Sequence, residues 1–156
     1  MISKSFVFAK LENLIEEYVE VHHQARAAFY ILPALENYYE FTRFMNALLS
    51  LLKRADIAPL YSWIYDSTRG CYKMVLLVKG SNRNDMTDIT NAIVRIWKLY
   101  SPYPIQFISD IPINYNSIIQ NVTQMEDIMN QIDFIPSIPQ KLLPSHQRAF
   151  AISQHI

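Results

Sequence analysis

The fold is decided by the stretch LYSWIYD-STRG-CYKMVLLV, which spans residues 60–78. Two runs rich in aromatic and aliphatic residues flank the segment 67–70, whose serine, threonine and glycine favour a turn. The pattern predicts a β-hairpin with strands at residues 60–66 and 71–78. The two glycines of the chain, Gly70 and Gly80, flank the second strand. So few glycines exclude a glycine-rich phosphate-binding loop.

Length and composition predict one folded domain around this hairpin. The chain has 156 residues, of which 51% are hydrophobic and 18% are charged, as in a typical globular protein. We expect a single domain at 1–156. It comprises an N-terminal helix at 1–25, a core at 26–133 and a tail at 134–156 that contains three prolines.

The order of the remaining elements predicts the fold class. Apolar periodicity favours helices at 10–25, 37–54, 86–100 and 115–132, and strands at 27–32 and 105–108 beside the hairpin. Pro33 would end the first strand, and Asp110 and Pro112 would close the last one. The sequence therefore predicts an α+β fold, in which a small antiparallel sheet is flanked by helices.

The charge balance argues against nucleic acid as the principal partner. Fourteen Lys and Arg residues balance fourteen Asp and Glu residues, and the isoelectric point is about 6.9. A dedicated nucleic-acid binder usually carries a surplus of basic residues, because these neutralise phosphates. Nucleic acid stays a second, weaker expectation that would need a local basic patch.

The cysteine count and the N-terminal stretch indicate the compartment. Cys71 is the only cysteine, which excludes an intrachain disulfide and gives no indication of secretion. The apolar start of the chain is too short for a signal peptide, and no apolar run reaches the length of a membrane span. We expect a soluble, intracellular protein without a membrane partner.

Four glutamates mark one side of the first predicted helix. Glu12, Glu16 and Glu20 recur every four residues, and Glu17 lies beside them. The opposite side is apolar and contains Leu11, Leu14, Ile15, Tyr18 and Val19. Two interpretations stay open: an ordinary solvated helix face, or an acidic stripe that binds a basic partner.

The hairpin resembles the metal-binding hairpin of the replication-initiation family of filamentous phages (inoviruses), which belongs to the HUH endonucleases. In that family one strand ends in an aromatic-aliphatic-x-acid run, matched here by residues 63–66 (Trp-Ile-Tyr-Asp). The next strand of the family opens with His-Tyr-His, where this chain has Cys71, Tyr72 and Lys73. The resemblance extends over about residues 26–154.

The tail carries the second part of the resemblance. The family has a Ser-Tyr-Leu-x-Lys segment with a catalytic tyrosine, then an Arg-x-Phe-x-x-Ser pattern. This chain has Ser-Ile-Pro-Gln-Lys at 137–141 and Arg-Ala-Phe-Ala-Ile-Ser at 148–153, so that Ile138 takes the place of the tyrosine. If residues 26–133 form an HUH-like core, the tail should pack against the sheet and bury Phe150 and Ile152.

The resemblance implies that the frame of a nicking enzyme is kept and its chemistry lost. Two histidines on one strand face would hold a divalent ion that polarises a phosphate, which the tyrosine attacks. Cys71 and Lys73 share a face, but a protonated lysine repels a metal, and Ile138 offers no nucleophile. We expect Asp66, Cys71, Lys73 and Ile138 to be degenerate motif positions, with no catalytic residue, metal, cofactor or nickase activity.

Four basic residues surround the hairpin in the sequence: Arg69, Lys73, Lys79 and Arg83. The resemblance implies that this face of the sheet holds DNA in the family. Two interpretations stay open for this chain. The residues either keep the strand ends soluble, or they form a residual surface for nucleic acid or for an acidic partner.

The leading hypothesis is a catalytically inactive, replication-initiator-like protein of a phage or mobile element that acts by binding. We expect it to inhibit host machinery in the bacterial cytoplasm as an anti-defence protein, for example an anti-CRISPR. Its partner would be a host protein or ribonucleoprotein complex, with no small-molecule substrate. The alternative is a non-cleaving, DNA-binding accessory or regulator of replication. A nickase with relocated catalytic residues is a third hypothesis.

Overall fold

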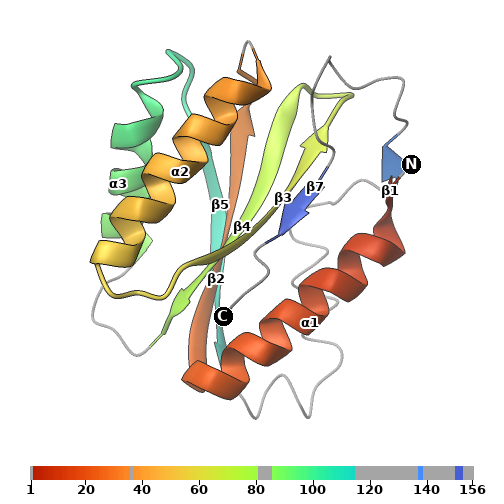
Figure 1. Ribbon diagram of the computed structural model, residues 1–156, viewed down its shortest axis with the longest axis vertical. Helices are drawn as coiled ribbons and strands as arrows, with labels where there is room; N and C mark the ends of the chain where they lie inside the picture. Colours follow the sequence, from red (N-terminus) through yellow and green to blue (C-terminus); the bar gives the residue numbers. More distant parts are fainter. Residues whose placement is uncertain (1, 36, 81–85, 115–136, 139–149, 153–156) are drawn as a thin grey trace.

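A five-stranded antiparallel sheet forms the centre of the molecule. The computed structural model describes residues 2–35, 37–80, 86–114, 137–138 and 150–152. The strands lie in the order β5-β2-β4-β3-β7, as Figure 1 shows. They are β2 (Gln24–Pro33), β3 (Leu60–Asp66), β4 (Cys71–Lys79), β5 (Gln106–Asn114) and β7 (Phe150–Ile152). The predicted α+β class, a small antiparallel sheet flanked by helices, is confirmed.

The predicted hairpin is present as β3 and β4. Leu60 pairs with Leu77 at one end of the ladder, and Asp66 pairs with Cys71 at the other. The turn closes through Gly70, whose backbone N–H donates to the Asp66 carbonyl at 2.8 Å. Gly70 has a φ of 62°, a left-handed conformation that glycine adopts without a steric penalty.

Within the described residues, three helices cover the two faces of the sheet. Figure 1 shows α2 (Tyr38–Arg54) and α3 (Met86–Trp97) on one side and α1 (Lys4–His22) on the other. Asn37 caps α2, because its side chain accepts a hydrogen bond from the Glu40 N–H at 3.0 Å. The first helix spans Lys4–His22 and not residues 10–25 as the periodicity predicts, and residues 24–25 already belong to β2. The fully buried Val7 extends the apolar face of the helix by one turn.

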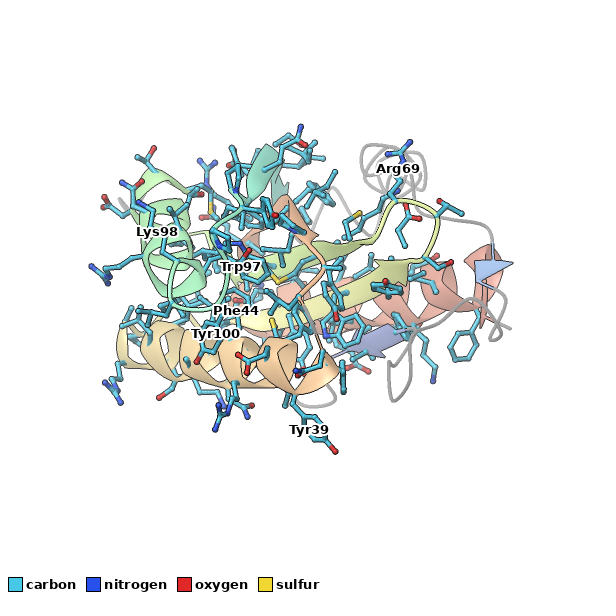
Figure 2. The ribbon with its side chains drawn as sticks, turned by 90° about the horizontal axis from the view of Figure 1, so that it is seen from above. Tyr39, Phe44, Arg69, Trp97, Lys98 and Tyr100 are labelled. Carbon is cyan, nitrogen blue, oxygen red and sulfur yellow. The ribbon has the colours of Figure 1, made fainter. Side chains whose placement is uncertain are left out.

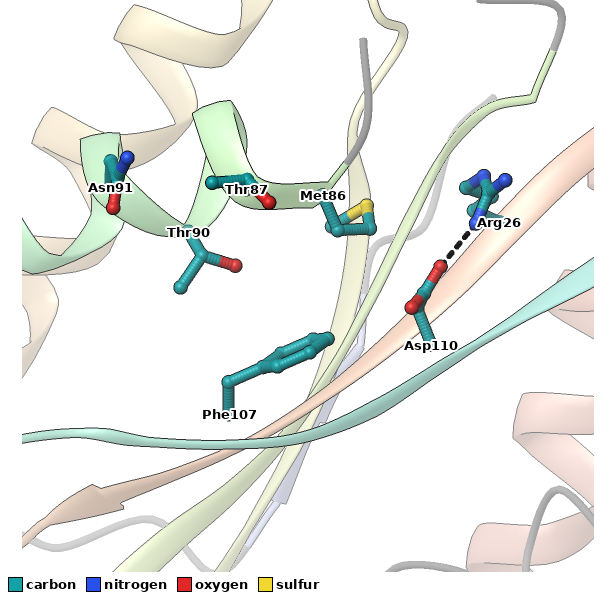
Figure 3. Close-up of a pocket in the computed structure, with 7 residues that line it drawn as sticks. All are labelled: Arg26, Met86, Thr87, Thr90, Asn91, Phe107 and Asp110. Atoms are coloured by element: carbon teal, nitrogen blue, oxygen red, sulfur yellow. Dashed lines mark hydrogen bonds and ion pairs between the residues drawn. The ribbon is translucent and has the colours of Figure 1, made fainter.

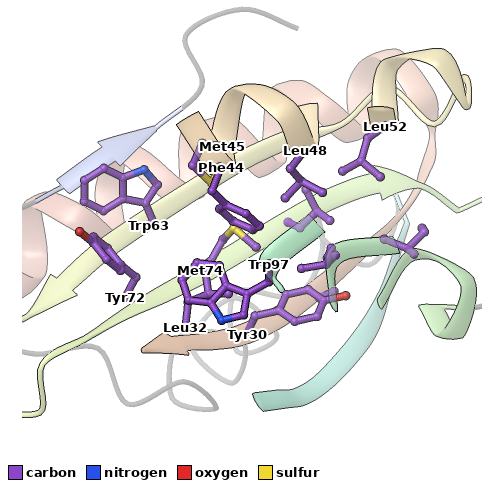
Figure 4. Packing of buried hydrophobic residues seen from close by; sticks show 14 of the residues in the cluster. Tyr30, Leu32, Phe44, Met45, Leu48, Leu52, Trp63, Tyr72, Met74 and Trp97 are labelled. Atoms are coloured by element: carbon purple, nitrogen blue, oxygen red, sulfur yellow. The ribbon is translucent and has the colours of Figure 1, made fainter. Parts of the chain in front are cut away.

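Two apolar clusters fill the space between the layers. The cluster on the α1 side contains the predicted apolar residues of that helix together with Ala27, Phe29, Ile64, Val75 and Leu77. Figure 4 shows part of the cluster under α2 and α3, which includes Tyr30, Phe44, Trp63, Met74 and Trp97. Strand β4 is buried from Cys71 to Val78, because side chains on both of its faces are covered.

Strand β5 is longer than the sequence predicts. The sequence predicts a strand at 105–108, closed by Asp110 and Pro112, but β5 continues through both residues to Asn114. Pro112 sits opposite Arg26 on a strand whose described partner is β2 alone. At the edge of a sheet a proline is tolerated, since its missing N–H need not join the ladder.

The tail contributes to the sheet. Residues 150–152 form β7, in which Phe150 pairs with Ile64 and Ile152 pairs with Ser62. Both side chains pack against the α1-side cluster, as predicted, but they are half-buried and not fully buried. Ser137–Ile138 form β6, which pairs with β1 (Ile2–Ser3) in a separate two-stranded sheet. The helix predicted at 115–132 lies outside the described residues.

Candidate functional site

The hairpin end gathers three of the four degenerate motif positions. Asp66 and Cys71 are cross-strand partners, and Lys73 lies two residues further along β4 on the same face. This face is the one turned toward α1, since Val75 and Leu77 of the same row belong to the α1-side cluster. Lys73 Nζ lies 3.4 Å from Asp66 Oδ2, and the two side chains are only 2% and 1% exposed. They form a buried ion pair.

The second oxygen of Asp66 organises the hairpin turn. Asp66 Oδ1 accepts hydrogen bonds from the Thr68 hydroxyl at 2.6 Å and from the backbone N–H groups of Thr68 and Arg69 at 3.0 and 3.1 Å. Burial opposes the charged carboxylate, but these hydrogen bonds and the Lys73 ammonium outweigh it and lower the pKa of Asp66. The carboxylate is therefore ionised and saturated with donors from its own chain.

The donor set does not fit the divalent ion that the family resemblance implies. Lys73 places an ammonium group against the one carboxylate of the cluster, and that charge would repel a metal cation. Burial and the Asp66 charge raise the pKa of the Cys71 thiol, so the sulfur is held in its protonated form, which is a poor ligand. No group of His, Cys, Asp and Glu in the described ranges has the geometry of a metal site.

Ile138, the fourth motif position, belongs to a different sheet. It pairs with Ile2 in the β1–β6 ladder, whereas Asp66, Cys71 and Lys73 belong to the five-stranded sheet. An isoleucine has no group able to attack phosphorus, whatever its surroundings. At the positions where the resemblance implies metal ligands and a nucleophile, the chain thus has Cys71, Lys73 and Ile138.

The glutamates of α1 mostly face solvent. Glu16, Glu17 and Glu20 are exposed and Glu12 is half-buried, whereas Leu11, Ile15 and Val19 are fully buried. None of the ion pairs within the described part of the chain involves these four glutamates. We call Glu12, Glu16, Glu17 and Glu20 the acidic face of α1.

The three described basic residues of the hairpin, Arg69, Lys73 and Lys79, do not form one basic surface. Lys73 and Arg69 both approach Asp66 Oδ2, at 3.4 and 3.9 Å. Lys73 is buried there, whereas the side chain of Arg69 is 60% exposed and projects outward from the hairpin turn (Figure 2). Lys79 lies at the other end of β4, about 26 Å from the turn at the usual rise per residue of a strand. Its ammonium group lies 3.4 Å from the exposed carboxylate of Asp56. Arg83 lies outside the described residues.

A cleft on the opposite face of the sheet is a site that the sequence did not reveal. It lies between α3 and strands β2 and β5, with a volume of about 270 Å³ (Figure 3). Its lining comprises Arg26, Met86, Thr87, Thr90, Asn91, Phe107 and Asp110. Arg26 and Asp110 form an ion pair whose side chains are 37% and 24% exposed.

A β-bulge places two of the cleft residues together. Tyr30 pairs with Phe107 and Phe29 pairs with Ser109, so β5 carries one extra residue at this point. Residues three apart on a regular strand face opposite ways, but here Phe107 and Asp110 both turn toward α3. The one local signal of this cleft in the sequence is a charged residue within the apolar segment 25–32, and this signal identifies Arg26 alone.

Tyr30 and Thr90 connect the sheet to α3 beside the cleft. Their hydroxyl groups lie 2.9 Å apart, and the Tyr30 ring contacts that of Phe107 at 5.4 Å between centroids. Burial raises the pKa of Tyr30 to about 12, so the hydroxyl stays protonated at neutral pH. The contacts of Tyr30 therefore connect the sheet wall of the cleft to the α3 wall.

Comparisons with protein-family models, with curated proteins and with solved structures find no match to the chain. None of the helices in the described ranges combines the length and the apolar character needed to cross a membrane. The family resemblance therefore rests on the motif positions themselves.

Proposed function

We propose that the chain is a non-catalytic, replication-initiator-like protein of a phage or mobile element, and that it acts by binding. The observation that carries this proposal is the buried Asp66–Lys73 ion pair. The ion pair occupies the strand positions at which the family that this chain resembles binds its metal ion. The Lys73 ammonium supplies a fixed positive charge there. If a protein keeps this fold but lacks the residues that catalyse nicking, we expect its surface to be the functional part, because the surface binds other molecules.

A protein partner fits these surfaces better than DNA does. The hairpin cations are separated or buried, and helices lie on both faces of the five-stranded sheet. The formal charge of the chain is zero, so no general attraction to phosphates helps binding. The acidic face of α1 is complementary to a basic surface, such as the nucleic-acid-binding surface of another protein.

The proposed target is a host protein or ribonucleoprotein complex in the bacterial cytoplasm, and the proposed effect is inhibition. Blocking the nucleic-acid site of a defence complex, for example a CRISPR effector, is the most concrete form of this activity. A bacterium whose CRISPR system targets a phage tests it directly. Expression of the chain is expected to restore plaque formation, and unchanged immunity would contradict this form of the proposal.

The binding step is tested by affinity purification of the full chain from a bacterial lysate, with and without nuclease. We expect a protein partner to co-purify in stoichiometric amount even after nuclease treatment. The partner should no longer co-purify with the double variant Glu16→Lys/Glu20→Lys. The control Glu40→Lys/Asp88→Lys makes the same change in net charge on α2 and α3 and should retain the partner. Recovery that depends on intact nucleic acid would replace the proposal with the alternative, a non-cleaving DNA-binding accessory.

A further inference from the structure

We propose that the cleft between α3 and β5 binds a nucleobase. The site lies on the face of the sheet opposite the Asp66–Lys73 pair, so this inference is independent of the proposed function. It rests on three features of the cleft: an exposed aromatic ring, a neutral pair of opposite charges at one end, and a volume suited to a small planar ligand.

Phe107 provides a stacking surface. Its side chain is 40% exposed, although phenylalanine is ordinarily among the most buried residues. Figure 3 shows it across the cleft from Thr90, with α3 above and β5 below. The bulge in β5 is what turns this ring toward the cleft, and bulges are frequent beside binding sites because they re-aim side chains.

The Arg26–Asp110 pair determines which polar group fits the end of the cleft. Because the carboxylate already neutralises the guanidinium, a phosphate or carboxylate would meet Asp110 as well as Arg26. A metal cation would likewise meet Arg26. A purely apolar ligand would displace the water bound to both charged groups and would offer no hydrogen bond in its place. The best match is a neutral edge that carries a donor for Asp110 next to an acceptor for Arg26.

A nucleobase has this edge together with a flat π-face. Adenine, guanine and cytosine each place an amino or ring N–H donor beside a ring nitrogen or carbonyl acceptor. Arg and Asp are among the side chains that read such edges, and every base can stack on an aromatic ring. The hydroxyl of Thr90 and the amide of Asn91 add polar groups along α3.

The size of the cleft agrees with this ligand. Its volume of about 270 Å³ lies just below the usual range for drug-sized ligands, about 300–1,000 Å³. A single base with part of its sugar fits such a space, and a phosphate would remain outside in solvent. The same chemistry is offered by a free nucleotide and by an unpaired base of a single strand.

Titration of the full ¹⁵N-labelled protein, followed by NMR, tests the proposal. The probes are AMP, GMP and CMP, a single-stranded hexadeoxynucleotide, and inorganic phosphate. We expect the amide signals of Arg26, Thr90 and Phe107 to shift with bases and not with phosphate. Equal affinity for monophosphates and the hexamer would assign a free nucleotide, whereas binding of the hexamer alone would assign an unpaired strand.

Two variants separate stacking from loss of structure. Phe107→Ala is expected to weaken binding about 5- to 150-fold, which corresponds to the loss of one stacked base. Phe107→Trp keeps the π-face and should retain binding. Tyr103→Ala removes another exposed ring, 65% exposed and outside the cleft lining, and should change nothing. Shifts with phosphate alone, no shifts with any base, or equal affinity of Phe107→Ala would each overturn the proposal.

Discussion

The sheet carries an ion pair on each face, and the two pairs differ in how much water they meet. Asp66 and Lys73 are 1% and 2% exposed on the α1 side, whereas Asp110 and Arg26 are 24% and 37% exposed on the α3 side. The Asp66 carboxylate is saturated by Lys73, Thr68 and the backbone of the turn. The first pair is therefore a structural element, while the second still faces a cleft that a ligand can enter.

The largest effect is expected from removing one member of the buried pair. Lys73→Met leaves Asp66 charged inside the protein, which should lower the free energy of unfolding by about 3–5 kcal/mol. Urea unfolding at neutral pH measures this difference. Lys79→Met is the control on the same strand, because its partner Asp56 is 94% exposed, and its cost should stay below about 1 kcal/mol. Equal costs for the two variants would show that burial does not distinguish the pairs.

The stability of the protein at acid pH tests the charge state of Asp66. A pKa lowered in the folded state means that this carboxylate stabilises the protein above about pH 4, and that the contribution is lost as the pH falls through the folded pKa. Asp66→Asn lacks this titration and also removes the carboxylate that forms the ion pair with Lys73. We expect the wild type to exceed the variant in stability at neutral pH, and the gap to narrow in acid. Urea unfolding from about pH 6 to about pH 2 measures it. A gap independent of pH would contradict the assignment.

The smallest effect is expected at the open pair. Arg26→Met should change the free energy of unfolding by about 1 kcal/mol or less, since both partners retain contact with water. Thermal unfolding beside Lys73→Met gives the comparison directly. A loss as large as that of Lys73→Met would mean that the Arg26–Asp110 pair is structural, which would remove the distinction between the two faces.

The regular elements could be predicted because their signals are local. Two runs of aromatic and aliphatic residues on either side of the turn at Gly70 specify the hairpin, and the period of Phe41, Phe44, Leu48 and Leu52 specifies α2. The common direction of Cys71 and Lys73 also follows from the period of a strand. The burial of Lys73 does not follow from this period, because it depends on how separate elements pack against the sheet.

The cleft could not be predicted for a related reason. Arg26, Thr90 and Asp110 lie far apart in the sequence. Arg26 and Asp110 meet through the register of β2 with β5, and Thr90 joins them because α3 packs over this face of the sheet. That register contains a bulge, and a regular alternation would have assigned Phe107 and Asp110 to opposite faces. Pro112 also shortened the predicted strand, since its tolerance depends on the edge position of β5 in the sheet.

Mn²⁺ binding measures whether the hairpin end is closed to the metal chemistry of the family that the chain resembles. Electron paramagnetic resonance of the full-length wild type should show no stoichiometric Mn²⁺ at neutral pH, because the Lys73 ammonium takes the place of the ion beside Asp66. Cys71→His/Lys73→His, which places two imidazoles on one strand face, is the variant expected to gain binding. Stoichiometric Mn²⁺ in the wild type, lost in Asp66→Asn, would show instead that the hairpin end is a metal site.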